Sequence, residues 1–168
     1  MGLFSSKKEN VLEIALESTL VNEGFRNKPY LDSKGILTIG HGINLESFKI
    51  AKLGDDFGVD FDYLYFLEHL EVTEEQSKVF VKNRLEKLFN KLNGKFVFFN
   101  ELPEDAMAVL IEMAYQMGID GLSKFKNTLS YLKDEEYYNA SVEMLDSQWH
   151  RSDSPNRAKR LSNIIRDC

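Results

Sequence analysis

The segment from Ala106 to Met117 carries apolar side chains on nearly every face that a helix would present. Pro103 stands just before it, where a helix tolerates proline, and acidic residues at 104 and 105 suit a first helical turn. Gly118 follows the segment and predicts the end of the helix. A helix that is apolar all round must be covered by other elements. The sequence therefore predicts a central buried helix around which much of the chain packs.

The composition is that of a globular chain with enough apolar residues to bury this helix. The chain has 168 residues, of which 43% are hydrophobic and 29% are charged, as in ordinary globular domains. The single cysteine, Cys168, is the last residue, so packing rather than a disulfide must hold the fold. No segment has the ~18 consecutive apolar residues that a membrane-spanning helix needs. We expect one domain over residues 1–168, without a signal peptide.

The charge balance of the chain is acidic. Its formal net charge is −6, which argues against a protein that binds the phosphate backbone of nucleic acids broadly. Cations are nevertheless concentrated in the last eighteen residues, where they could present a local positive face. They are Arg151, Arg157, Lys159, Arg160 and Arg166.

Helical signals recur on both sides of the buried segment. A capping box at Ser6 and Glu9 predicts a first helix from about residue 9 to 22, and a second box at Thr73 and Gln76 predicts a long amphipathic helix over about 74–92. A helix of that length could bridge two lobes. Further helices are expected at 122–132, 135–145 and 155–165.

One β region is predicted, between Tyr30 and Leu45. Gly35, Gly40 and Gly42 stand there among β-branched residues, which is typical of a small antiparallel sheet with tight turns. His41 is expected on the surface of this hairpin. Residues 46–72 are expected to be irregular, with one or two helical turns. Together these signals indicate an α+β fold that is predominantly helical.

Two acidic residues stand at the start of the β region. Glu23 ends the first predicted helix, whereas Asp32 follows a break at Pro29 and opens a turn. Carboxylates on different elements can have different pKa values, so that one serves as an acid while the other stays ionised. Cleavage of a glycosidic bond needs such a pair. On spacing alone, two surface acids at a helix end and a turn remain the simpler explanation.

The segment from Glu23 to Thr38 resembles the phage-type lysozymes, or endolysins, which are muramidases typified by the T-even phage enzyme. The family pattern of Glu, eight residues, Asp, five residues and Thr is matched at Glu23, Asp32 and Thr38. Residues 113–118 resemble the family's buried-helix motif, and Trp149 with residues 154–160 gives a third match. The three matches stand in the family's order and cover the chain from about residue 10 to 166, although 46–72 matches poorly.

This resemblance implies a two-lobed lysozyme fold. The N-terminal lobe, about 10–72, would hold the small antiparallel β-sheet, a linking helix would span about 74–92, and the helical C-terminal lobe would span about 93–168, with the first helix packed near it. Peptidoglycan would bind between the lobes. The implied reaction is hydrolysis of the β-1,4 bond between N-acetylmuramic acid and N-acetylglucosamine, without a metal or an organic cofactor.

The resemblance also implies a role for individual residues. Glu23 would be the general acid, while Asp32 and Thr38 would position water on the opposite face of the sugar. Arg157 corresponds to the arginine that pairs with the catalytic glutamate in relatives. The implied substrate-binding residues are Asn44, Tyr115, Gln116, Asn127, Thr128 and Glu143.

Some of these positions depart from the family or have simpler explanations. Asn44 and Glu143 replace a leucine and an asparagine, and His41 stands two positions earlier than the family's histidine. Ordinary helix packing would equally explain Tyr115, Gln116 and the two residues at 127 and 128. Trp149 is expected in the core rather than as a platform for a sugar.

The implied partner is bacterial peptidoglycan, bound by a monomer without nucleic acid and without stable membrane insertion. The protein is expected in the host cytoplasm and would act on the wall in the periplasm, after holin-dependent release or as part of a virion. Two alternatives stay open. A lytic transglycosylase would leave Asp32 and Thr38 without a task, and a non-catalytic wall-binding or virion structural domain would not need Glu23.

Overall fold

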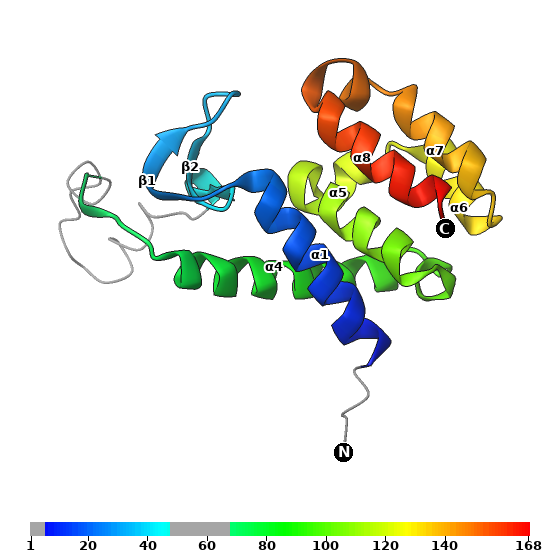
Figure 1. Cartoon of the computed structure of the whole chain (residues 1–168), viewed down its shortest axis with the longest axis horizontal. Coiled ribbons are helices and arrows are strands. Elements are labelled where there is room, and N and C mark those ends of the chain that lie inside the picture. The colour runs from blue at the N-terminus through cyan, green and yellow to red at the C-terminus, as the bar shows by residue number, and fades with distance from the viewer. Residues whose placement is uncertain (1–5, 48–67) are drawn as a thin grey trace. The chain divides into compact units, whose positions relative to one another are not determined.

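The computed structural model describes residues 6–47 and 68–168 (Figure 1). The described chain is mainly helical and contains one three-stranded antiparallel sheet, which confirms the predicted α+β class. The chain divides into two compact units, residues 19–81 and residues 1–18 with 82–168. We call them the sheet unit and the helical unit. Most of the stretch predicted to be irregular, 46–72, lies outside the described residues.

The sheet unit is built on a short meander of strands in the order β1-β2-β3. Ile39 and Ile43 lie opposite each other on β2 and β3, and both are buried in a core that Leu45 completes. Successive residues of a strand face opposite sides. Thr38 and Asn44, the neighbouring pair in the register, therefore lie on the other face of the sheet. The strands are β1 (Arg26–Leu31), β2 (Leu37–Gly40) and β3 (Ile43–Asn44), followed by the 3₁₀ turn η1 (Leu45–Ser47).

The break predicted at Pro29 is absent, because strand β1 continues through this residue. The register of β1 against β2 shifts between Arg26 and Tyr30, and Pro29 lies in that irregular part. β1 is an edge strand, where the missing N–H of a proline is tolerated. The sheet therefore begins four residues before the predicted start at Tyr30.

Helices α1 (Lys7–Glu23) and α4 (Glu74–Lys95) start at the two predicted capping boxes. In the first box the Ser6 amide donates to Glu9 Oε2 at 2.7 Å and the Glu9 amide donates to Ser6 Oγ at 3.3 Å. In the second, the Thr73 amide donates to Gln76 Oε1 at 2.9 Å and the Gln76 amide donates to Thr73 Oγ1 at 3.1 Å. Side chains thus satisfy amides that a helix start leaves without a backbone partner.

The helical unit surrounds α5 (Glu104–Leu122), whose residues 106–115 are all buried. This confirms the predicted central helix. Gly118 has φ of 75° and ψ of 167°, a conformation that side chains disfavour, so the helix breaks where predicted before one more turn reaches Leu122. α8 contacts both α5 and α7 (Figure 1). The remaining elements are η2 (Phe99–Glu101), α6 (Lys126–Lys133), α7 (Tyr137–Leu145), the π turn η3 (Trp149–Asp153) and α8 (Pro155–Arg166).

None of the helices within residues 6–47 and 68–168 is long and apolar enough to cross a membrane.

Candidate active site

Glu23 is the last residue of α1, and its carboxyl group lies against the turn between β2 and β3. A Cβ atom added to Gly42 would come within 2.8 Å of Glu23 Cδ. Gly42 also has a φ of +69°, so both the space and the backbone conformation favour glycine. Glu23 is half-buried. The backbone of the turn therefore forms one wall around the predicted acid.

Asp32 lies in the loop between β1 and β2, where backbone groups hold its carboxylate. Asp32 Oδ1 accepts hydrogen bonds from the amides of Lys34 and Ile36, both at 2.8 Å. The Asp32 amide in turn donates to the Ile36 carbonyl at 3.0 Å. Such an Asx turn is a common way to close a tight loop. The half-buried carboxylate is thereby fixed relative to the sheet.

Thr38 lies on the central strand, between two residues of the neighbouring strands. Its register partners are Tyr30 on β1 and Asn44 on β3, so the three residues form one row across the sheet. Thr38 is only 4% exposed, and its hydroxyl donates to the Ile36 carbonyl at 2.9 Å. The structure therefore brings the predicted residue Asn44, which is exposed, beside Thr38.

Both predicted acids affect the pKa of Tyr30. Burial raises the pKa of the Tyr30 phenol, the Arg26 cation lowers it, and the charges of Glu23 and Asp32 both raise it. The Arg26 guanidinium carbon lies 4.4 Å from the centre of the Tyr30 ring, a cation–π contact. Both acids thus lie close enough to act on the same phenol. Tyr30 was not among the site residues predicted from the sequence.

His41 is buried, at 3% exposure, so the predicted surface position is wrong. Its backbone amide donates to Ser77 Oγ at 2.9 Å, and its Nδ1 lies 2.8 Å from the same oxygen. Burial lowers the pKa of His41, while Glu74 raises it and Lys78 lowers it. The signal that could have indicated burial is the pair of flanking glycines, since bare Cα atoms allow a turn to approach another element closely.

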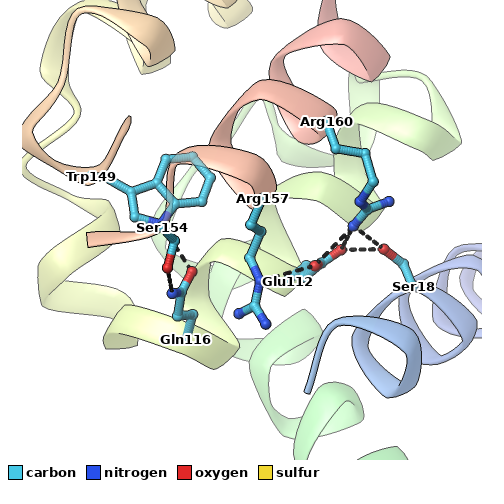
Figure 2. A network of polar contacts seen from close by, with 7 residues as sticks. All are labelled: Ser18, Glu112, Gln116, Trp149, Ser154, Arg157 and Arg160. Atoms are coloured by element: carbon cyan, nitrogen blue, oxygen red, sulfur yellow. Dashed lines mark hydrogen bonds and ion pairs between the residues drawn. The ribbon is translucent and has the colours of Figure 1, made fainter. Parts of the chain in front are cut away.

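In the helical unit, Arg157 has a partner that the sequence analysis missed. Its Nε lies 3.9 Å from Glu112 Oε1, and the Glu112 side chain is only 2% exposed. Arg160 Nη2 donates to the two Glu112 oxygens at 3.1 and 3.2 Å, and Ser18 also donates to this carboxylate (Figure 2). The signal that could have indicated this partner is a charged residue within an otherwise apolar helical segment, because a buried charge has to be paired. The pairing of Arg157 with Glu23 stays a prediction.

Gln116 uses both ends of its amide group within the helical unit. Its Nε2 donates to Ser154 Oγ at 2.6 Å, and its Oε1 accepts from Trp149 Nε1 at 2.9 Å (Figure 2). Trp149 is buried and packs edge-on against Phe125, with ring centroids 6.0 Å apart. The prediction that Trp149 belongs to the core is confirmed. Gln116 links α5 to the start of α8.

The other predicted substrate-binding residues of the helical unit fall into two groups. Tyr115 and Thr128 are buried, and the guanidinium carbon of Arg84 lies 5.8 Å from the centre of the Tyr115 ring. Asn127 is exposed and donates through Nδ2 to Glu143 Oε2 at 3.1 Å, which joins α6 to α7. Their role in substrate binding stays a prediction. Across the described residues, no group of three or more His, Cys, Asp or Glu side chains could hold a metal ion.

Comparison with known proteins identifies the family of this fold and site. The model of the phage lysozyme family matches residues 21–165, a range that includes Glu23, Asp32 and Thr38. The chain belongs to the phage lysozyme family, which confirms the resemblance found in the sequence. Membership supports peptidoglycan hydrolysis of the lysozyme type as the general activity, within the glycoside hydrolases.

Two similar proteins come from Dictyostelium discoideum. Its probable T4-type lysozyme 2 is 25% identical over 151 residues, which are 86% of this chain and 88% of that protein. Its probable T4-type lysozyme 1 is 24% identical over 151 residues, with the same coverage of both chains. The similarity therefore extends over most of the length on both sides.

Proposed function

We propose that this chain hydrolyses the β-1,4 bond between N-acetylmuramic acid and N-acetylglucosamine in bacterial peptidoglycan. The observation that carries the proposal is the placement of Glu23, Asp32 and Thr38. They match the family pattern and lie in one unit, on a helix end, a hairpin loop and the central strand. Because the two carboxyl groups have different surroundings, they can be in different protonation states during one reaction.

In the proposed mechanism, Glu23 donates its proton to the glycosidic oxygen as the bond to the anomeric carbon breaks. Water attacks that carbon from the opposite face of the sugar and inverts its configuration. Asp32 accepts a proton from this water. Thr38 Oγ1 accepts a second hydrogen bond from the water, since its own hydrogen is donated to the Ile36 carbonyl. The proton lost by Glu23 and the proton gained by Asp32 are exchanged with solvent.

Other residues have supporting roles in this proposal. Arg157 would pair with Glu23, and the exposed amide of Asn44, beside Thr38 in the sheet, would contact the sugar. The remaining members of the proposed substrate-binding set are Tyr115, Gln116, Asn127, Thr128 and Glu143. The protein would act as a monomer on the wall in the periplasm, and would reach it from the host cytoplasm by a holin-dependent route or within a virion.

Mass spectrometry of peptidoglycan digested by the pure protein tests the function. The native chain should release muropeptides with hydrated reducing ends. Glu23→Gln should release none while keeping the melting temperature, because it removes the proton but keeps the shape of the side chain. Glu17→Gln is the matched control, since Glu17 is an exposed acid of the same helix, and it should retain activity.

The other outcomes are equally informative. Anhydro products would indicate a lytic transglycosylase. A folded native chain that releases nothing at any pH or salt concentration would indicate a non-catalytic wall-binding or virion structural domain. Near-normal hydrolysis by Glu23→Gln would contradict the assignment of Glu23 as the acid.

A further inference from the structure

The turn at residues 40–42, between β2 and β3, is confined on two sides. On one side, a Cβ atom added to Gly40 would come within 3.0 Å of Ser77 Cβ on α4. On the other, a Cβ atom added to Gly42 would come within 2.8 Å of Glu23 Cδ. Real Cβ atoms essentially never lie as close as 2.8 Å to another atom, and a distance of 3.0 Å is tighter than most Cβ contacts. The turn therefore fills the space between Ser77 and Glu23. Because the packing is close, a shift of the turn beside Ser77 also shifts its backbone beside Glu23.

Ser77 and His41 fix this turn through one shared oxygen. Ser77 Oγ accepts a hydrogen bond from the His41 amide at 2.9 Å, and it lies 2.8 Å from His41 Nδ1. A hydroxyl that accepts from the amide can donate its single hydrogen to Nδ1. That arrangement suits a neutral imidazole with its hydrogen on Nε2, and burial of the ring favours the same neutral form.

Both partners of this hydrogen-bonded pair are buried, at 3% exposure for His41 and 1% for Ser77. Removal of either side chain would break at least one hydrogen bond of a buried polar group, which is costly. Movement of the turn would relieve that cost, because water or another group could then reach the polar atom. The hydrogen bonds between His41 and Ser77 therefore favour the observed position of the turn.

The imidazole ring provides a second link to Glu23. His41 packs against Phe25, with ring centroids 5.2 Å apart and an interplanar angle of 40°. Phe25 follows Glu23, the last residue of α1, by two residues. His41 thus contacts the chain segment that carries the acid, while the neighbouring Gly42 contacts the acid itself.

We propose that His41 and Ser77 are positioning residues for Glu23, because their hydrogen bonds hold the turn whose backbone at Gly42 packs against the Glu23 carboxyl group. This inference rests on the proposed function of Glu23 as the acid. Their effect is carried by the turn, because its backbone at Gly42 lies against the Glu23 carboxyl group. The charged groups of α4 that act on the imidazole are Glu74 and Lys78.

A kinetic comparison of four variants of the full chain separates positioning from simple stabilisation. His41→Phe keeps a ring beside Phe25 and the amide bond to Ser77 but removes the bond at Nδ1, whereas Ser77→Ala removes both bonds. His41→Asn keeps an amide group near the position of Nδ1. Ser141→Ala is the matched control, because it removes a buried hydroxyl of the helical unit, whose partner is the Tyr138 carbonyl.

The measurements are kcat and KM on soluble peptidoglycan fragments, well below each melting temperature. A misplacement of about 1 Å can reduce a rate ~100-fold, so we expect kcat to fall at least ~10-fold in His41→Phe and Ser77→Ala, with KM within about twofold. His41→Asn should recover most of the loss. Ser141→Ala should lower the melting temperature without changing kcat. Unchanged kcat in folded His41→Phe would overturn the inference, whatever its melting temperature.

A nuclear magnetic resonance measurement tests the same coupling without using activity. The amide resonance of Gly42 should shift on Glu23→Gln in the native background, and this response should be at least halved when Ser77→Ala or His41→Phe is also present. An equal response in all backgrounds would overturn the inference. Reduced responses in a protein that hydrolyses nothing would support the positioning and contradict the proposed function. If Ser77→Ala does not fold, His41→Phe decides the test.

Discussion

Thr38 presents its hydroxyl oxygen in one direction, because its hydrogen is donated to the Ile36 carbonyl at 2.9 Å. We expect Thr38→Val to lower kcat on the order of 100-fold, since the shape is kept while the oxygen that would hold water is lost. Thr38→Ser should remain within about tenfold of the native rate. Hydrolysis of soluble fragments measures both. Equal rates for Val and Ser at this position would contradict water positioning by Thr38.

Burial lowers the pKa of His41 below the ordinary histidine value of 6.5, so this residue makes the stability of the protein depend on pH. Between the lowered pKa and 6.5, the unfolded chain binds a proton that the folded chain does not. The free energy of unfolding is then expected to rise with pH in this window. The contribution is fully present above 6.5 and is lost as the pH falls through the lowered pKa.

Urea unfolding at a series of pH values checks this prediction. The native chain should lose stability as the pH falls below 6.5, and His41→Asn should lose less over the same range because its side chain does not titrate. His150→Asn is a suitable comparison, since His150 is a histidine of the other unit and only half-buried. An identical pH dependence for the native chain and His41→Asn would show that other groups cause the effect.

At the scale of elements, α5 contains a buried charge that α8 neutralises. Glu112→Gln should lower the free energy of unfolding by on the order of 2 kcal/mol, because Arg160 and Arg157 would lose their anionic partner in a buried place. The Arg160 side chain is 41% exposed, so water would relieve part of the loss. Urea unfolding is the measurement.

An exposed ion pair provides the control for Glu112. Asp146 and Arg151 are joined at 2.7 Å, but their side chains are 80% and 61% exposed. Asp146→Asn should therefore change the free energy of unfolding by less than about 1 kcal/mol. Equal effects of the two substitutions would mean that burial does not distinguish these pairs.

The elements that could be predicted are those whose signals are local. The capping boxes gave the starts of α1 and α4, and the apolar run gave α5, because these patterns report on neighbouring residues. Boundaries between successive helices, and features that depend on distant residues, were not predicted. The helix predicted from residue 122 starts only at Lys126, since Leu122 still belongs to the last turn of α5.

The same distinction holds for the candidate site. Glu23, Asp32 and Thr38 were found because a family pattern lies within one short stretch of sequence. Ser77 is 36 residues from His41, and Arg160 is 48 residues from Glu112. The spacing of residues along the chain does not indicate such pairs, because only the fold brings the two residues together. In the structure, such pairs are recognised by the burial of their polar side chains.

At the scale of the whole molecule, the net charge is −6 with the C-terminal cations included. Several of these cations have anionic partners close by. Arg157 and Arg160 lie at Glu112, and Arg151 lies at Asp146. Arg166 bonds to the adjacent Asp167 at 3.0 Å. A strong local positive face is therefore not expected from this group, and the net charge should dominate the encounter with an anionic wall.

The dependence of wall lysis on salt tests this conclusion. Because the protein and the wall are both anionic, they repel each other at low ionic strength, and salt screens that repulsion. Clearing of wall suspensions should become a few times faster between about 10 mM and about 150 mM salt, as the Debye length falls from ~30 to ~8 Å.

The double variant Glu13→Lys and Glu17→Lys replaces two exposed acids of α1 and should be faster at low salt and less sensitive to added salt. Both proteins should cleave short soluble peptidoglycan fragments, which lack the extended anionic surface of the wall, at rates much less sensitive to salt. If the native protein instead clears walls more slowly as salt is added, a local cationic surface, and not the net charge, controls its approach to the wall.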